Sequence, residues 1–225
     1  MPEHENIRRD AGIRALLLPF IRGEYEGHPD LVCLEEFAIY GGANRADVAA
    51  LNGCSHGYEI KSDRDTLERL PTQVDAYSAI FDQATLVTTA RHLQQARTII
   101  PQWWGIIEAT CSTGGGIRLE RIRESGGNPA PHAESIAYLL WRPEALRLLS
   151  SLGLDSGIRS KPMECLVARL AKEIPVQRLS ALVREALRAR GDWRSAARLR
   201  QCDGRFQQPS SLSSYQRTPY GRTYR

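Results

Sequence analysis

The sequence predicts an α/β protein, a mixed β-sheet flanked by helices, followed by an all-helical C-terminal extension. Three observations predict this class. An amphipathic helical segment precedes three short strand-like runs separated by turns, strand-like and helical segments then alternate, and after about residue 135 only helical periodicity remains. A chain of 225 residues is long enough for one main domain with a smaller part attached to it.

The first element is a helix predicted over residues 5–22. Ile13, Leu16, Leu17 and Phe20 recur at i, i+3, i+4 and i+7, which places apolar side chains on one face of a helix. The glycines and the proline of "GEYEGHPD", which follows, end this pattern, so we expect a turn there.

Three strand-like runs come next, at residues 30–40, 45–53 and 56–62. The turn sequence "GGAN" separates the first two, and the strong hairpin signal Asn52-Gly53 follows the second. Connections this short join antiparallel neighbours, so the three runs are predicted to form a meander.

Helices and strands alternate in the rest of this half of the chain. Residues 63–82 return to a helical pattern, in which Pro71 suits a first helical turn. We expect the order α-β-β-β-α-β, completed by a further helix and strand. The elements predicted after residue 82 are a strand at 84–90, a helix at 91–100, a strand at 103–111 and an edge strand at 116–122.

Composition divides the chain into four parts. Residues 1–124 hold the α/β pattern, and residues 125–134 form a linker rich in glycine and proline. Residues 135–193 carry helical periodicity. Residues 194–225 lack apolar periodicity and are predicted to be a disordered, basic tail.

The net charge of +4 is unevenly distributed. Residues 192–225 contain seven arginines and two aspartates, which leaves about −1 for the other 191 residues. A basic surface on the body of the protein therefore depends on how its charges are arranged and not on their excess.

The cysteines and the apolar runs predict a cytoplasmic protein. Five scattered cysteines without a C-x-x-C pair favour reduced thiols and argue against structural zinc. The first ten residues are polar, which argues against a secretory signal, and no apolar run is long enough to cross a bilayer.

The tripeptide Glu59-Ile60-Lys61 carries the strongest functional signal. Lys61 is one of three lysines in a chain that has twenty-seven arginines. Residues i and i+2 of a strand share a face, so Glu59 and Lys61 would lie together while Ile60 packs into the core. If the neighbouring strands pair as a hairpin, Asp47 lies beside Glu59.

Two adjacent carboxylates form an oxygen-ligand site suited to Mg²⁺ or Mn²⁺. Asp47 and Glu59 are the candidate metal ligands, with the backbone carbonyl of Ile60 as a third. A hard cation there would polarise a phosphodiester oxygen and acidify a bound water. Lys61 would hold that water or neutralise charge on the phosphorus, which suits a compact ammonium better than a guanidinium. An isolated Glu-x-Lys is also typical of a solvent-facing strand, so that interpretation stays open.

"GGANRAD" followed by "YEIKSD", placed between two helices, resembles the PD-(D/E)XK nuclease superfamily. The stretch from Glu35 to Thr89 is similar to a small uncharacterised family of bacterial and phage proteins of that fold. The pattern is distantly similar to the MmcB-like DNA-repair proteins. The resemblance covers residues 5–122, and within the narrow family it extends to about residue 193. It implies a restriction-endonuclease-like core and a Mg²⁺- or Mn²⁺-dependent endonuclease acting on nucleic acid, on DNA rather than RNA.

Position by position, the resemblance implies the two carboxylates as metal ligands and Lys61 as the catalytic lysine. It adds Gln73, on the helix after the Glu-x-Lys strand, as a further residue of the catalytic site. It also implies an acidic residue from the first helix or strand, here either Glu35 or Glu36. Ala46 stands where the superfamily name has proline, a departure common among its members.

Three arginines are candidates for contact with nucleic acid. Arg45 is equally suited to a phosphate contact or to an ion pair with a neighbouring glutamate. Arg184 and Arg188 lie on the second of two helices that could form a helix-turn-helix or a small SAP-like module. The favoured alternative is a helical cap packed on the sheet domain. A homodimer, or a protein partner bound through these helices, is left open, and no membrane partner is expected.

The leading expectation is a metal-dependent endonuclease that hydrolyses phosphodiester bonds. The alternative is a catalytically inactive protein of the same fold that binds nucleic acid or acts as a regulatory or adaptor module. Carboxylates that converge beside Lys61 in an open cleft would favour the enzyme, whereas carboxylates splayed apart would favour the inactive scaffold.

Overall fold

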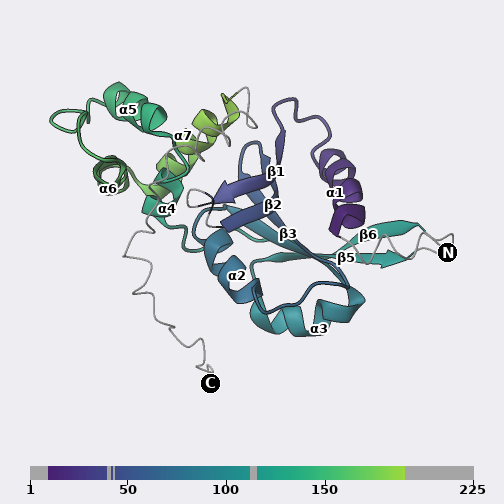
Figure 1. The fold of residues 1–225 in the computed structure, drawn as a ribbon. Helices are drawn as coiled ribbons and strands as arrows, with labels where there is room; N and C mark the ends of the chain where they lie inside the picture. Colours follow the sequence, from purple (N-terminus) through teal and green to yellow (C-terminus); the bar gives the residue numbers. More distant parts are fainter. Residues whose placement is uncertain (1–9, 40–41, 43, 112–115, 191–225) are drawn as a thin grey trace, which may run out of the picture. The chain divides into compact units, whose positions relative to one another are not determined.

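The described part of the chain is built on a six-stranded mixed sheet whose strands lie in sequence order (Figure 1). The structure is a computed structural model and describes residues 10–39, 42, 44–111 and 116–190. The strands are Val32–Ile39 (β1), Asn44–Leu51 (β2), Ser55–Lys61 (β3), Gln83–Thr89 (β4), Gly105–Cys111 (β5) and Ile117–Arg123 (β6). Strands β1 to β3 pair antiparallel, β3 to β5 pair parallel, and β5 pairs antiparallel with β6.

Seven helices accompany the sheet in the described residues. They are Asp10–Glu24 (α1), Leu70–Ser78 (α2), Ala90–Ile99 (α3), Ala133–Ala137 (α4), Arg142–Ser151 (α5), Met163–Glu173 (α6) and Val176–Arg188 (α7). Helix α1 precedes the sheet, α2 and α3 connect its parallel strands, and α4 to α7 follow β6. The predicted α/β class, the α-β-β-β-α-β order and the helical C-terminal region are therefore confirmed.

Helix α1 covers one face of the sheet. Ile13, Leu17 and Ile21, spaced by four residues, are fully buried against apolar residues of β2 and β3. The predicted apolar stripe was wrong in part, because Leu16 is 38 % exposed and Phe20 is only half-buried. The contact follows the i, i+4 row of the helix and not the i, i+3 row.

Helices α2 and α3 cover the opposite face (Figure 1). Gly57 of β3 lies directly beneath the rings of Phe81 and Tyr77, which leave no room for a Cβ atom. Pro71 lies in the first turn of α2, as predicted. The helix occupies only part of the predicted range, since residues 62–69 form an irregular connection after β3.

The pairing register aligns acidic residues of the first three strands. The β2–β3 pairing matches Val48 with Tyr58, and one step further it brings Asp47 opposite Glu59. The β1–β2 pairing brings Glu36 opposite Asp47 in the same way. Three carboxylate residues therefore stand in a row across β1, β2 and β3.

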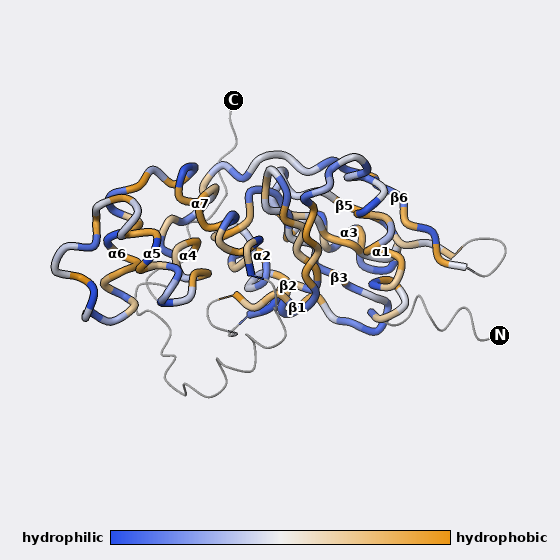
Figure 2. Tube along the Cα trace, turned by 90° about the horizontal axis from the view of Figure 1, so that it is seen from above, coloured by the Kyte–Doolittle hydropathy of each residue, from blue (hydrophilic) through white to orange (hydrophobic). Residues whose placement is uncertain are grey.

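Asp82, between α2 and β4, contacts the helical C-terminal region. Its carboxylate accepts a hydrogen bond from the amide of Ser55 at 2.8 Å and from Ser180 Oγ at 3.0 Å, and it pairs with Arg184 at 2.8 Å. Figure 2 shows hydrophobic and hydrophilic stretches alternating along α4 to α7, as expected of helices buried on one side. Helix α7 buries three apolar side chains, Leu179, Val183 and Leu187.

Residues Met1–Gly191 form one compact unit. The domain boundaries placed at residues 124, 134 and 193 stay predictions, and the predicted tail at 194–225 lies outside the described residues. Among the described helices, none combines the length and apolar character that crossing a membrane requires. The cysteines that the structure describes are free thiols: Cys33, Cys54, Cys111 and Cys165.

Candidate active site

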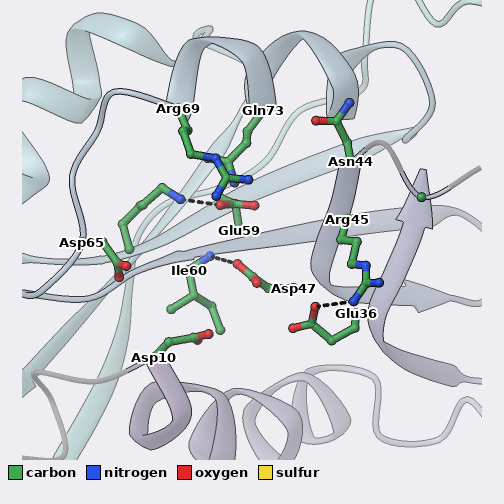
Figure 3. Close-up of a pocket in the computed structure, with 12 residues that line it drawn as sticks. Asp10, Glu36, Asn44, Arg45, Asp47, Glu59, Ile60, Asp65, Arg69 and Gln73 are labelled. Atoms are coloured by element: carbon green, nitrogen blue, oxygen red, sulfur yellow. Dashed lines mark hydrogen bonds and ion pairs between the residues drawn. The ribbon is translucent and has the colours of Figure 1, made fainter. Parts of the chain in front are cut away.

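A cavity of about 380 Å³ opens over the row of carboxylates, between the first turns of α1 and α2 (Figure 3). Seven of its twelve lining residues are candidates from the sequence: Glu36, Arg45, Asp47, Glu59, Ile60, Lys61 and Gln73. The other five are Asp10, Gly42, Asn44, Asp65 and Arg69. The fold therefore brings most of the candidate residues of the α/β half into one place.

Two donors hold the carboxylate of Glu59. Lys61 Nζ lies 2.6 Å from Oε1, and the hydroxyl of Tyr77 donates to Oε2 at 2.6 Å. Glu59 is only 1 % exposed and Lys61 is also buried. The two side chains share one face of β3, as strand alternation leads us to expect.

The surroundings raise the pKa of Glu59 to about 7. Burial is the largest cause, and the negative charge of Asp47 adds to it. Lys61 and the hydroxyl of Tyr77 act in the opposite direction but do not outweigh burial. A cation placed beside this carboxyl group would favour its charged form.

Asp47 is anchored at both carboxylate oxygens. The amide of Ile60 donates to Oδ2 at 2.8 Å, and the guanidinium of Arg14 donates to Oδ1 at 2.8 Å. Burial raises the pKa of Asp47, while the Ile60 amide and the charge of Arg14 counteract burial. The side chain is still 21 % exposed and lines the cavity.

The hydroxyl of Tyr77 connects the two carboxylate residues. It donates to Glu59 and accepts a hydrogen bond from the amide of Asp47 at 3.2 Å. Burial, with the charges of Glu59 and Asp47, raises the pKa of Tyr77 well above its ordinary value, so the hydroxyl keeps its proton. The sequence marks this residue only by its position one turn after Gln73 on α2.

Helix α2 supplies one wall of the cavity. Arg69 and Gln73, four residues apart at its start, both lie above Glu59 (Figure 3). Oε1 of Gln73 is buried and has no hydrogen-bond partner among the described residues. A buried amide oxygen without a donor is costly, so this atom suits a bound water or ligand.

Strands β1 and β2 supply the opposite wall. Arg45 is 59 % exposed and lies 3.8 Å from Glu36, a loose pair that leaves its guanidinium accessible. Glu36 has a φ of 52°, in the left-handed region that non-glycine residues rarely adopt. Of the two acidic alternatives, Glu36 lines the cavity and Glu35 does not.

The two C-terminal candidate arginines lie away from the cavity. Arg184 pairs with Asp82 at 2.8 Å, and Arg188 pairs with Asp30 at 3.2 Å. Their side chains are 15 % and 29 % exposed. Both arginines form ion pairs with acidic residues of the same chain, so the geometry does not favour their predicted contact with nucleic acid.

Residues 3–215 match the family of bacteriophage P4 protein cII. This chain belongs to the phage P4 cII family. The match runs from α1 through the sheet and past α7, so it includes the cavity and the C-terminal helices alike. Protein cII of Enterobacteria phage P4 is 25 % identical over 146 residues, which make up 63 % of this chain and 54 % of that protein. The chain thus spans about half the length of this curated relative.

A solved structure, a protein of unknown function from Silicibacter pomeroyi, is also similar to this cII-family chain. It covers 59 % of the chain and 86 % of its own length, with 18 % sequence identity and a TM-score of 0.35. Neither this likeness nor the family name assigns a reaction.

Sequence reasoning misses several side chains of the cII-family cavity. Asp10 lines it from α1, and Arg14 of the same helix binds Asp47. Arg69 and Asp65 come from the irregular connection between β3 and α2. The four-residue spacings of Asp10 with Arg14 and of Arg69 with Gln73 are weak local signals, because exposed helices show them often.

The donor set suits a hard divalent cation. Five acidic and three basic residues line the cavity, and the two carboxylates with raised pKa values, Asp47 and Glu59, stand beside the backbone of Ile60. Within the described ranges, no group of three histidine, cysteine or acidic side chains is arranged to hold an ion. Binding would therefore depend on two carboxylates, a peptide carbonyl and oxygens from water or substrate, a set typical of Mg²⁺.

Proposed function

We propose that this cII-family protein is a Mg²⁺- or Mn²⁺-dependent nuclease that hydrolyses phosphodiester bonds in DNA. The observation that carries the proposal is that Asp47, Glu59 and Lys61 line one open cavity, with Lys61 bound to Glu59. The resemblance of these residues to the PD-(D/E)XK pattern supports it and favours DNA as the substrate. We also propose a cytoplasmic setting, on the scattered cysteines of the sequence, which lack a C-x-x-C pair.

The carboxylates of Asp47 and Glu59 and the carbonyl of Ile60 would hold the divalent ion, which when bound supplies Lewis-acid activation of a phosphoryl oxygen and of water. Lys61 uses one of its three N–H donors on Glu59. The remaining donors orient the attacking water and stabilise negative charge on the phosphorus. The hydroxyl of Tyr77 and the amide of Ile60 fix the two carboxylates before substrate arrives.

Both walls of the cavity supply groups suited to a nucleic-acid backbone. Arg45 projects from β2 and Arg69 from the start of α2 (Figure 3). Guanidinium groups contact phosphate oxygens without reading sequence. Gln73 offers a buried acceptor between these walls and Glu59. A strand crossing the cavity between Arg45 and Arg69 would place a phosphodiester over the two carboxylates.

A cleavage assay on the full-length chain tests the proposal. Supercoiled plasmid, single-stranded DNA and RNA are incubated with Mg²⁺ or Mn²⁺ and with the wild type, Asp47→Asn or Lys61→Met. We expect metal-dependent cutting of DNA by the wild type and a loss of at least about a hundredfold in both variants. Glu35→Gln, at an exposed carboxylate that does not line the cavity, is the matched control and should cut like the wild type. Cutting that is equal in all four proteins would come from a contaminant and would reject the proposal.

A catalytically inactive nucleic-acid-binding or adaptor protein is the second candidate. The observation that favours it is that both carboxylates already have internal partners, Lys61 and Tyr77 for Glu59 and Arg14 for Asp47. Binding of DNA without cutting, unchanged in Asp47→Asn, would favour this function. Light scattering on the same samples tests a homodimer, and cross-linking tests a protein partner on α4 to α7.

A further inference from the structure

Arg14 brings a guanidinium from α1 to the row of carboxylates. Its Nη2 lies 2.8 Å from Oδ2 of Asp10 and 2.8 Å from Oδ1 of Asp47. Its Nη1 lies 2.9 Å from Oε1 of Glu36 and 2.8 Å from the backbone carbonyl oxygen of Asp47. Arg14 is only 13 % exposed and Asp47 is 21 % exposed, so solvent screens this pair less than an ordinary surface ion pair, whereas Asp10 and Glu36 are 43 % and 52 % exposed.

Arg14 stays charged in this position. An arginine side chain keeps its proton throughout the ordinary pH range, and here three carboxylates contact its guanidinium nitrogens at 2.8–2.9 Å. A permanent positive charge therefore stands against three carboxylates on the α1 side of the cavity. Part of the negative charge that Asp47 would offer to a divalent ion is already neutralised.

We propose that Arg14 is an internal cation of this site, which positions Asp47 and keeps a divalent ion weakly bound until a substrate phosphate supplies further oxygen ligands. The inference rests on the proposed metal-dependent nuclease function. Arg14 is a positioning residue, because it acts through its contacts with Asp47.

The positioning part follows from three contacts on one residue. Arg14 holds Oδ1 and the backbone carbonyl of Asp47, and the amide of Ile60 holds Oδ2. The carboxylate can therefore not rotate, and its free lone pairs keep one direction. The fork of a guanidinium makes two such contacts at once, whereas an ammonium acts as a single point charge.

The weak-binding part follows from charge and ligand number. A guanidinium next to Asp47 repels a divalent ion bound to the same carboxylate. The described residues also provide no group of three protein side chains for the ion. A phosphate between Arg45 and Arg69 would add both negative charge and oxygen ligands, so the ion and the nucleic acid should bind cooperatively.

Titration with Mn²⁺, followed by the electron paramagnetic resonance signal of the free ion, tests this without any turnover. The full chain is titrated alone and with a phosphorothioate DNA oligonucleotide. We expect the wild type to bind Mn²⁺ at least about tenfold more tightly with the oligonucleotide than without it. Arg14→Gln should bind Mn²⁺ without DNA at least about tenfold more tightly than the wild type, because the repelling charge is gone.

Two further variants separate charge from positioning. Arg14→Lys keeps the charge and should bind Mn²⁺ like the wild type, but its kcat should fall because the two-nitrogen contact is lost. Arg22→Gln removes an exposed arginine from the same helix and should leave both quantities unchanged. Circular dichroism checks that each variant is folded. If Arg14→Gln does not fold, the Mn²⁺ affinity and the kcat of Arg14→Lys test the inference.

Several results would overturn the inference. Equal Mn²⁺ affinity of Arg14→Gln and the wild type would show that the charge of Arg14 does not weaken metal binding. Tighter Mn²⁺ binding by Arg14→Lys, which keeps the charge, would contradict the same claim. Equal wild-type affinity with and without DNA removes the cooperativity. In each of these cases Mn²⁺ still binds, and the proposed nuclease stands. Absence of Mn²⁺ binding by every variant in every mixture would instead reject the metal site, and with it both proposals.

Discussion

The hydroxyl of Tyr77 lies 2.6 Å from Oε2 of Glu59 and 3.2 Å from the amide nitrogen of Asp47. One fully buried phenol on α2 therefore connects the acidic residues of two neighbouring strands. Helix α2 thus does more than cover the sheet. It supplies the donor that satisfies a carboxylate which burial would otherwise leave short of hydrogen bonds.

Replacing Tyr77 with Phe removes this donor and changes little else in volume. We expect a loss of about 1–3 kcal/mol in the free energy of unfolding, since Glu59 keeps its burial and loses a hydrogen bond. Metal-dependent cleavage should also fall. Urea unfolding and the plasmid assay measure the two effects, with Tyr138→Phe, a half-buried tyrosine of the helical region, as the control. Unchanged stability and cleavage in Tyr77→Phe would show that the hydroxyl has no such role.

Glu59 and Lys61 should behave as a coupled pair. Lys61→Met leaves the buried carboxyl group of Glu59 without its cation. In the double variant, Glu59→Gln also removes the negative charge of that carboxyl group. In a double-mutant cycle we expect the double variant to be less destabilised than the sum of the single ones, by about 1–3 kcal/mol. Chemical denaturation of the four proteins measures this coupling. Additive effects would mean that the two side chains do not interact in solution.

Gly57→Ala tests how closely α2 packs on β3. A Cβ atom at this position would lie 2.5 Å from the ring of Phe81 and 2.9 Å from the ring of Tyr77. We expect destabilisation by about 1–3 kcal/mol from overpacking, together with reduced cleavage, because Tyr77 has to move. Gly53→Ala is the matched control, since nothing lies within 4 Å of its Cβ position. Similar melting temperatures for the two variants would contradict the close packing of Phe81 and Tyr77 on Gly57.

Arg69→Ala tests the phosphate contact on the α2 wall. We expect DNA binding to weaken by a similar factor for every sequence, and the salt dependence of the affinity to lose about one unit of slope. Filter binding at several salt concentrations measures both. Arg178→Ala removes an exposed arginine on α7 and should leave the slope unchanged. An equal change of slope in both variants would show that the charge of Arg69 acts only through the total charge of the protein.

His56 predicts a dependence of stability on pH. Its ring stacks on Tyr58 and its Nε2 lies 2.7 Å from Thr85 Oγ1. Burial, assisted by the charge of Arg121, lowers the pKa of His56 to about 3. Between pH 6.5 and pH 3 the unfolded chain therefore binds a proton that the folded chain does not.

The contribution of His56 to stability should fall as the pH is lowered through that window, by up to about 1.4 kcal/mol per pH unit. The raised pKa of Glu59 acts in the opposite direction below about pH 7 in both proteins, so the difference in slope between the wild type and His56→Gln reports on His56. Above pH 6.5 the contribution of His56 is fully present. Urea unfolding at pH 7.5, 6 and 5 measures the slope. His56→Gln cannot take up this proton and should show a flatter profile. Parallel profiles for the wild type and His56→Gln would contradict the buried, neutral state of the ring.

The placement of the acidic residues and the lysine on strands β2 and β3 could be predicted from the sequence, because it depends on short-range geometry. The side chains of Glu59 and Lys61 share a face through the two-residue repeat of a strand. Asp47 lies opposite Glu59 because the hairpin between them is short, which leaves few registers open. The choice of Glu36 over Glu35 was not predictable, since the positive φ of Glu36 breaks the regular alternation of β1.

Local sequence patterns determined the order of helices and strands. They also determined that a row of carboxylates lies beside one lysine. The completion of the cavity was decided by tertiary structure. Arg14 lies 33 residues from Asp47 in sequence and reaches it only because Ile13, Leu17 and Ile21 bury α1 on the sheet. The hydrophobic effect that buries an apolar helix face has no preferred direction. The sequence pattern therefore predicts that the helix packs on the sheet, but it does not predict where along the sheet the polar residues of the helix will lie. The ion pairs of Arg14 follow from that docking.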